Sequence, residues 1–232
     1  QRLRDLLNMS AGDRHIVDKR STRIKGSRLH HRSMDLETIA NLLEGTKKRG
    51  TGIFYNSFLA DVIANYIAFK SGDKYDDLMR SIFQDKVKIK YRISYEKHKK
   101  GWDWDSKYLG KLETQASYSY YMTRTDFFRV AVAMMKDYQK QTCVGKYLKK
   151  AQLQAVTWPK YRPNKNSNSK LWLHKYAKKY GAQFYFDFNG MDGRNIFGTE
   201  GRNGQNMLID MDNSQIIVTN SAATAWDQTI YM

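Results

Sequence analysis

Residues 197–205 read Phe-Gly-Thr-Glu-Gly-Arg-Asn-Gly-Gln, and they lead into the segment that decides the fold. An apolar alternation follows at residues 206–211, then a polar link at 212–215 and a second apolar run at 216–219. Two strand-like runs joined by a short polar link predict a β-hairpin. The glycines allow another group to approach the first strand closely, and Arg202 adds a cation there. Such an edge suits carboxylate binding and oxyanion stabilisation, although most glycine-rich hairpins have no such role.

The composition of the chain is typical of a globular protein. Its 232 residues can hold one large domain or two small ones, and 41% of them are hydrophobic. No apolar run approaches the ~18 residues that a transmembrane helix needs, so no membrane span is predicted. A single cysteine, Cys143, excludes a disulfide within the chain and a zinc site built from cysteines. We expect its thiol to be inert and part-buried.

The formal net charge of +17 indicates either a polyanionic partner or a solvated basic surface. A polyanion here could be nucleic acid, an anionic membrane surface or an acidic polymer. The basic residues are spread along the chain, at Lys19-Arg20, Lys47–Arg49, Lys97–Lys100, Lys149-Lys150 and Lys178-Lys179. No signature of a nucleic-acid-binding module accompanies them. We therefore interpret them as a solvated surface and predict no nucleic-acid partner.

Helix signals occupy the first two thirds of the chain. A short amphipathic helix is predicted at residues 2–9, and a second helix, capped by Asp35, runs through Leu43. A strongly apolar helix is predicted over residues 58–70, followed by another over residues 75–83. The expected buried side of the apolar helix consists of Phe58, Leu59, Val62, Ile63, Tyr66 and Ile67.

A further helix is predicted from Asp126 through Met135 and beyond, with Thr123 and Thr125 as candidate caps. Residues 13–33 and 159–170 have the composition of loops, and residues 86–120 are irregular and aromatic. Residues 180–188 predict a strand ahead of the terminal hairpin. Helices in the middle and strands late in the chain predict an α+β fold, an antiparallel sheet flanked by helices.

Five segments, taken in order, resemble motifs of the serine β-lactamase and penicillin-binding-protein superfamily, in particular its class C-like serine hydrolases. Residues 3–12, LRDLLNMSAG, resemble the segment that follows the nucleophile helix, and residues 54–57, FYNS, resemble the Y-x-N/S loop. Residues 122–129 resemble the start of an "xTxxDxxR" helix, and residues 180–185 resemble a "YGxxxW"-type strand with Tyr in place of Trp. Residues 201–205, GRNGQ, lie where the family has "GHxGQ" or a Lys-Thr-Gly triad.

The resemblance implies one β-lactamase/transpeptidase-like domain over residues 1–232, incomplete at its N-terminus. Its mainly helical and loop region would cover about residues 13–160, and its C-terminal strands about residues 180–232. It also implies acyl transfer by a serine of an S-x-x-K motif, with no cofactor. The substrate would be a small molecule or peptide that carries an ester, amide or β-lactam bond. A periplasmic or secreted protein is the expectation from the family.

Site residues are carried over from the resemblance one by one. Tyr55 would be the general acid/base, with its pKa lowered by nearby cations, and Ser57 would orient substrate or relay a proton. Arg202 would bind a carboxylate and supply positive potential. Gln205 would lend its backbone N–H to the oxyanion hole. Asn203 and Gly204 would shape the strand edge, completing the expected substrate-binding set.

The expected nucleophile is missing from its place in the motif order, because the S-x-x-K motif should precede the LRDLL segment. Three S-x-x-K strings occur, at residues 71–74, 94–97 and 167–170, but none lies at that place. We therefore expect a fragment of a longer hydrolase, inactive alone and prone to association at strand edges. The alternative is a non-catalytic module of the same fold that binds a peptide or an anionic ligand.

Other chemistry-bearing residues have plainer interpretations. Tyr55 can be an ordinary tyrosine, and Ser57 can be a helix N-cap. Asp126 at a helix start is expected to serve the helix, with Arg129 as its partner or as a surface residue. The adjacent histidines at 30 and 31 are a weak candidate for a metal site, because they lack a third ligand. Asp103 and Asp105 alternate with tryptophans and could line a substrate cleft, but we expect a packed aromatic loop there.

Overall fold

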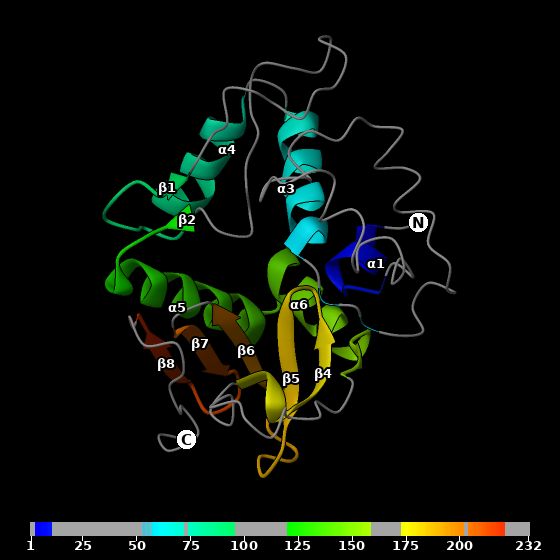
Figure 1. The fold of residues 1–232 in the computed structure, drawn as a ribbon. Helices are drawn as coiled ribbons and strands as arrows, with labels where there is room; N and C mark the ends of the chain where they lie inside the picture. Colours follow the sequence, from blue (N-terminus) through cyan, green and yellow to red (C-terminus); the bar gives the residue numbers. More distant parts are fainter. Residues whose placement is uncertain are drawn as a thin grey trace. The chain divides into compact units, whose positions relative to one another are not determined.

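The computed structural model describes residues 3–10, 53, 55, 57–71, 74–95, 120–158, 173–201 and 204–220 (Figure 1). The chain divides into two compact units, which are described separately: Gln1–Lys86 with Tyr91–Met122, and Val87–Lys90 with Thr123–Met232. A six-stranded antiparallel sheet with helices confirms the α+β prediction. The predicted helix after Asp35 and the predicted loops at 13–33 and 159–170 lie outside the described residues.

The first unit consists mainly of helices. Its elements are α1 (Leu3–Leu7), α3 (Ser57–Ser71), α4 (Tyr75–Arg80), the π-helix η4 (Ser81–Lys86), β1 (Ser94–Tyr95) and β2 (Tyr120–Tyr121). The predicted helices at 2–9, 58–70 and 75–83 are therefore confirmed, with small differences in their ends. Within the described residues of the chain, no helix is long and apolar enough to cross a membrane.

Fewer side chains of α3 are buried along its length than its apolar pattern predicted. Leu59 and Ile63 are buried, as expected from their spacing of one helical turn, but Tyr66 and Ile67 are exposed. The prediction for these two side chains was wrong. A physical reason is that α1, which packs against α3, has five residues and a length of only about 7 Å. It is too short to cover a helix of 15 residues.

A tyrosine pair joins α4 to the short β1–β2 ribbon of the first unit. Tyr75 is buried at the start of α4, and its hydroxyl lies 2.7 Å from that of Tyr120 in β2. One hydroxyl donates and the other accepts, so each phenol oxygen has a partner as it leaves water. This hydrogen bond connects residues that are 45 positions apart.

The second unit is a sheet covered by two helices. Its strands are β3 (Val156–Thr157), β4 (Ala177–Gly181), β5 (Phe184–Phe188), β6 (Ile196–Gly201), β7 (Gln205–Asp210) and β8 (Gln215–Thr219), arranged in sequence order with antiparallel neighbours. A 3₁₀ turn, η7 (Leu173–Lys175), precedes β4. The helices α5 (Arg124–Lys140) and α6 (Cys143–Leu153) lie along one face of this sheet (Figure 1).

The start of α5 agrees with the sequence. Thr123 is the N-cap, and its side chain accepts a hydrogen bond of 3.1 Å from the backbone N–H of Asp126. Asp126 is fully buried and accepts from Arg129 at 2.5 Å and from the backbone N–H of Lys90 at 2.7 Å. Its structural interpretation and its pairing with Arg129 are therefore confirmed. The carboxylate ties residues 87–90 to the first turn of α5.

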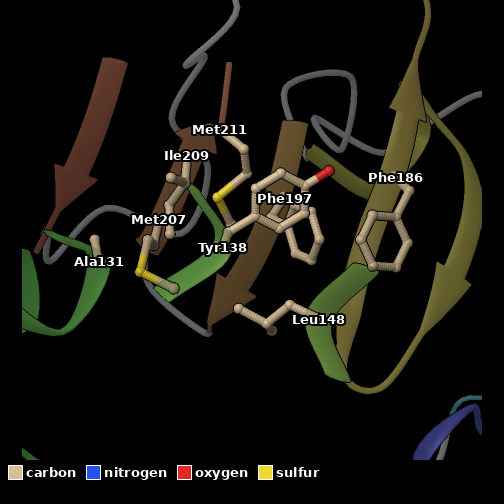
Figure 2. Packing of buried hydrophobic residues seen from close by; sticks show 8 residues of the cluster. All are labelled: Ala131, Tyr138, Leu148, Phe186, Phe197, Met207, Ile209 and Met211. Atoms are coloured by element: carbon tan, nitrogen blue, oxygen red, sulfur yellow. The ribbon is translucent and has the colours of Figure 1, made fainter. Parts of the chain in front are cut away.

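The core of the second unit forms between the helices and the sheet (Figure 2). It contains Ala131 and Tyr138 from α5, Leu148 from α6, and Phe186, Phe197, Met207, Ile209 and Met211 from the sheet and its β7–β8 turn. The rings of Phe186 and Phe197 meet edge to face with centroids 4.7 Å apart. Alternate residues of β6 and β7 thus face the helices, which fixes the register of both strands.

Two sequence predictions in this unit need correction. The single strand predicted at 180–188 is a hairpin, because β4 and β5 are joined by a two-residue turn at Ala182 and Gln183. Both turn residues have positive φ, 48° and 70°, which is the geometry of a type I′ turn without its usual asparagine and glycine. The helix α6 and the strand β6 were not predicted. The predicted β7–β8 hairpin is confirmed.

Candidate functional site

The candidate site is the end of the β6–β7 hairpin. Gly201 and Gln205 form the last residue pair of the two strands, and residues 202–204 connect them. A Cβ atom added at Gly201 would come within 2.8 Å of the carbonyl oxygen of Gln205 and 2.9 Å of its Cβ. Gly204 has a φ of +76°, which a residue with a side chain rarely adopts. The strands can close this tightly because glycine occupies both positions.

Two hydrogen bonds hold this strand end in place. The Thr219 hydroxyl of β8 donates to the Gly204 carbonyl at 2.8 Å, and the Gly201 backbone N–H donates to the Asn206 side-chain oxygen at 3.3 Å. The Thr219 and Asn206 side chains are themselves buried. The backbone around Gln205 is therefore fixed by three neighbouring strands, which is the kind of preorganisation that oxyanion stabilisation requires.

A contact between a carboxylate and an imidazole at the same strand end was not found from the sequence. One carboxylate oxygen of Glu200, the residue before Gly201, accepts from the His174 backbone N–H at 2.8 Å and lies 3.0 Å from His174 Nδ1. Both side chains are mostly buried. The ring of Trp158 lies 6.2 Å from that of His174, and the ring of Tyr185 lies 6.3 Å from it. This contact holds η7 against the end of β6.

The sequence contained no local signal for this pair. His174 and Glu200 are 26 residues apart, and only the sheet topology brings them together. An Nδ1–H that donates to the carboxylate fixes the imidazole tautomer, so the ring has a defined orientation. The contact between the Glu200 carboxylate and the His174 imidazole therefore orients the end of β6.

The opposite end of β7 carries a buried carboxylate with a structural role. Arg194 Nε donates to Asp210 Oδ2 at 2.7 Å, and the Asn213 side chain donates to the same oxygen at 2.8 Å. Arg194 Nη2 lies 2.5 Å from this oxygen in the ion pair. The backbone N–H groups of Asp212 and Asn213 donate to Asp210 Oδ1. Burial alone would raise the pKa of Asp210, but the hydrogen bonds from Asn213 and Arg194 and the charge of Arg194 lower it overall.

Of the four strand-end residues expected from the resemblance, the structure describes two. Gly204 and Gln205 lie side by side at the start of β7, as expected for neighbours in sequence. Arg202 and Asn203 lie outside the described residues. Their roles as a carboxylate ligand and a shaper of the edge stay predictions.

Tyr55 and Ser57 belong to the first unit, whereas the strand end belongs to the second. The Tyr55 side chain is 53% exposed, and Ser57 is the first residue of α3. That position agrees with a helix-start serine, although the side chain itself is not described. The catalytic roles of Tyr55 and Ser57 stay predictions.

The remaining candidates give one correction. Cys143, expected to be part-buried, is exposed at the first residue of α6, because its helix position points away from the sheet. Ser71 is the last residue of α3, and Ser94 lies in β1. Outside the described residues lie the histidines at 30 and 31, the aspartates at 103 and 105, and the serine at 167. Among the residues that the structure describes, no group of three His, Cys, Asp or Glu side chains could hold a metal ion.

No protein-family model matches this chain, and no curated protein sequence matches it.

Proposed function

We propose that this chain is part of a β-lactamase-related serine hydrolase that transfers an acyl group from an ester, amide or β-lactam to an active-site serine. The observation that carries the proposal is the strand end at Gly201–Gln205, closed tightly by glycine and held by Thr219 and Asn206. Acyl transfer creates an oxyanion, and rigid backbone donors stabilise it most because they need no reorganisation. The fold proposed for the chain is accordingly β-lactamase/transpeptidase-like.

In this mechanism the Gln205 backbone N–H contributes to the oxyanion hole. Tyr55 takes the proton of the nucleophilic serine and returns it to the leaving group, and Ser57 orients substrate or relays that proton. The exposure of Tyr55 supports this role, since a general acid/base has to reach the substrate. The nucleophile is the serine of an S-x-x-K motif, as the resemblance implies.

The substrate class follows from the cation at the strand end. Arg202 is connected directly to Gly201, and its guanidinium can bind a carboxylate through two parallel hydrogen bonds. The net charge of +17 further favours acidic or carboxylate-bearing substrates. Asn203 and Gly204 shape the edge along which the substrate lies. A small molecule or a peptide with a free carboxylate is the proposed substrate.

Covalent labelling tests the proposal. The protein made from its complete coding sequence is treated with a fluorophosphonate or a fluorescent penicillin, and mass spectrometry locates the labelled residue. We expect label on a serine followed three residues later by a lysine. Tyr55→Phe should slow labelling by about 10²- to 10⁴-fold, the usual contribution of a general acid/base. Tyr91→Phe is the matched control, because Tyr91 lies in the same unit and is 55% exposed, close to the 53% of Tyr55.

A second variant tests the carboxylate contact. Arg202→Ala should lower kcat/KM for a carboxylate-bearing ester by about 10- to 100-fold and leave a neutral ester nearly unaffected. No label on the folded protein would refute the hydrolase proposal. Retained binding of a carboxylate ligand, weakened by Arg202→Ala, would then indicate the alternative, a non-catalytic binding module of the same fold.

A further inference from the structure

The helix α6 has one face packed inward and one face exposed. Gly145, Leu148 and Ala151 are buried, and Leu148 belongs to the core between the helices and the sheet. The Thr142 hydroxyl accepts a hydrogen bond of 3.2 Å from the Gly145 backbone N–H, which caps the helix. Capping and burial together fix the rotation of α6, and therefore which side chains point outward.

The exposed side of α6 combines apolar side chains with lysines. Leu153 is 86% exposed, Val144 is 50% exposed and Tyr147 is 49% exposed. Lys146 and Lys150 are also exposed. Four of them, Lys146, Tyr147, Lys150 and Leu153, are linked by spacings of three or four positions and lie within about 120° of one another around the helix axis. Val144 is nine positions from Leu153 and lies on the opposite side of the helix, next to the buried Leu148 and Ala151. We call the four residues Lys146, Tyr147, Lys150 and Leu153 the α6 face.

The surroundings of the α6 face are strongly cationic. Residues 136–153 contain one acidic residue, Asp137, and the lysines at positions 136, 140, 146, 149 and 150. The Asp137 carboxylate accepts a hydrogen bond of 2.6 Å from the Thr142 hydroxyl. Lys149 places its Nζ 4.9 Å from the ring centroid of Tyr138, so its charge is directed at that ring. Lys136 and Lys140 are exposed and extend the positive potential from α6 onto the end of α5.

We propose that the α6 face binds an anionic lipid surface, with Tyr147 and Leu153 in the headgroup region and Lys146 and Lys150 against the lipid phosphates. Basic helices with exposed apolar residues lie in the membrane interface in this way. The apolar residues decide between lipid and nucleic acid. A nucleic-acid backbone would neutralise the lysines but leave Leu153 in water, whereas a bilayer accommodates both kinds of side chain. The proposal is independent of the proposed hydrolase function.

Vesicle co-sedimentation of the full chain tests the proposal. We expect binding to phosphatidylcholine vesicles that contain about a third phosphatidylglycerol, and little binding to pure phosphatidylcholine. Because each lysine near an anionic surface contributes about fivefold in affinity, Lys146→Glu with Lys150→Glu should weaken binding by about 25-fold or more. Leu153→Asp should also weaken it, since it removes apolar contact and adds a negative charge.

Controls separate the α6 face from the overall charge. Lys74→Glu with Lys86→Glu makes the same change in net charge at exposed positions of the first unit, and should leave vesicle binding almost unchanged. Circular dichroism checks that each variant is folded. Equal losses in both lysine pairs would overturn the proposal, because binding would then follow net charge alone. So would normal vesicle binding by Leu153→Asp together with displacement of the vesicles by duplex DNA.

The single cysteine gives a readout that needs none of these variants. Cys143 is exposed at the first residue of α6, three and four positions before Lys146 and Tyr147, and can carry a polarity-sensitive fluorophore. Anionic vesicles should shift its emission to shorter wavelength, and neutral vesicles should not. Sedimentation with anionic vesicles without any such shift would place the contact elsewhere on the chain and overturn the proposal.

Discussion

The most specific stability prediction concerns the buried carboxylate of Asp210. Its side chain is fully buried and forms an ion pair with Arg194. It accepts from Arg194 Nε, from the Asn213 side chain, and from the backbone N–H groups of Asp212 and Asn213. Asp210→Asn keeps the shape but removes the charge and turns an NH₂ toward these donors. Removing one partner of a buried ion pair costs about 3–5 kcal/mol, because the other charge loses its compensation. We expect a loss of unfolding free energy in that range.

A second ion pair of the same sheet is the control. Asp187 in β5 pairs with Lys179 in β4 at 2.8 Å, but both side chains are more than a third exposed. Exposed pairs contribute about 0.2–1 kcal/mol, since water screens them and ordering two long side chains opposes them. Asp187→Asn should therefore change the unfolding free energy by about a third of the Asp210→Asn effect or less.

Urea unfolding followed by circular dichroism measures both variants, and amide hydrogen exchange in β7 and β8 shows whether the loss is local to the hairpin. The pH dependence provides a further test of sign. The pKa of Asp210 is lowered from its ordinary value of 3.8, so its stabilisation is fully present above that value and is lost as pH falls through the lower folded pKa. The difference between the parent and Asp210→Asn should therefore shrink below about pH 4. Equal effects of Asp210→Asn and Asp187→Asn at pH 7 would refute the reasoning.

Three further predictions use the same urea assay. Gly145→Ala adds a Cβ that would overlap the Asp137 carbonyl and come within 2.9 Å of the Tyr138 Cα. The free-energy cost of this overpacking should exceed the gain of about 1 kcal/mol in helix propensity, so the variant should be less stable. A more stable variant would show that α5 and α6 can separate freely. Thr142→Ala should cost about 1 kcal/mol, because the α6 N-cap is lost, and an unchanged midpoint would contradict that role. Ala182→Gly should raise the unfolding free energy by about 0.5 kcal/mol, because glycine adopts the positive φ of this turn without strain and this relief exceeds the entropy cost of glycine. A lower unfolding free energy would mean that the turn is not strained.

The elements predicted correctly are those with strong local signals. The β7–β8 hairpin has two apolar runs and a polar turn, and α5 has a threonine cap ahead of an apolar pattern. The β4–β5 turn was missed because Ala182 and Gln183 carry no turn signal, although both adopt positive φ. The helix α6 was missed as well, although Leu148 and Ala151 on its packed side follow the spacing of a helix.

The candidate site was predictable only where it is local in sequence. The glycines at 201 and 204 and the residue Gln205 could be found because their spacing lies within one hairpin. The contact between His174 and Glu200 could not, because it depends on how a sheet arranges residues 26 positions apart. Apolar periodicity identifies the buried face of an element but carries no information about which distant polar side chains meet there.

The arrangement of β6 also explains why the strand end is rigid. Successive side chains of a strand point to opposite faces, so Glu200 and Gly201 lie on different sides of the sheet. Glu200 holds His174 on one side, while Gly201 pairs with Gln205 on the side that faces the helices. The strand end is thus fixed on one face by the contact between Glu200 and His174, and on the other by the close backbone pairing of Gly201 with Gln205. Rigidity of this kind serves an ordinary hairpin as well as an oxyanion hole, so covalent labelling decides between them more directly than any stability measurement.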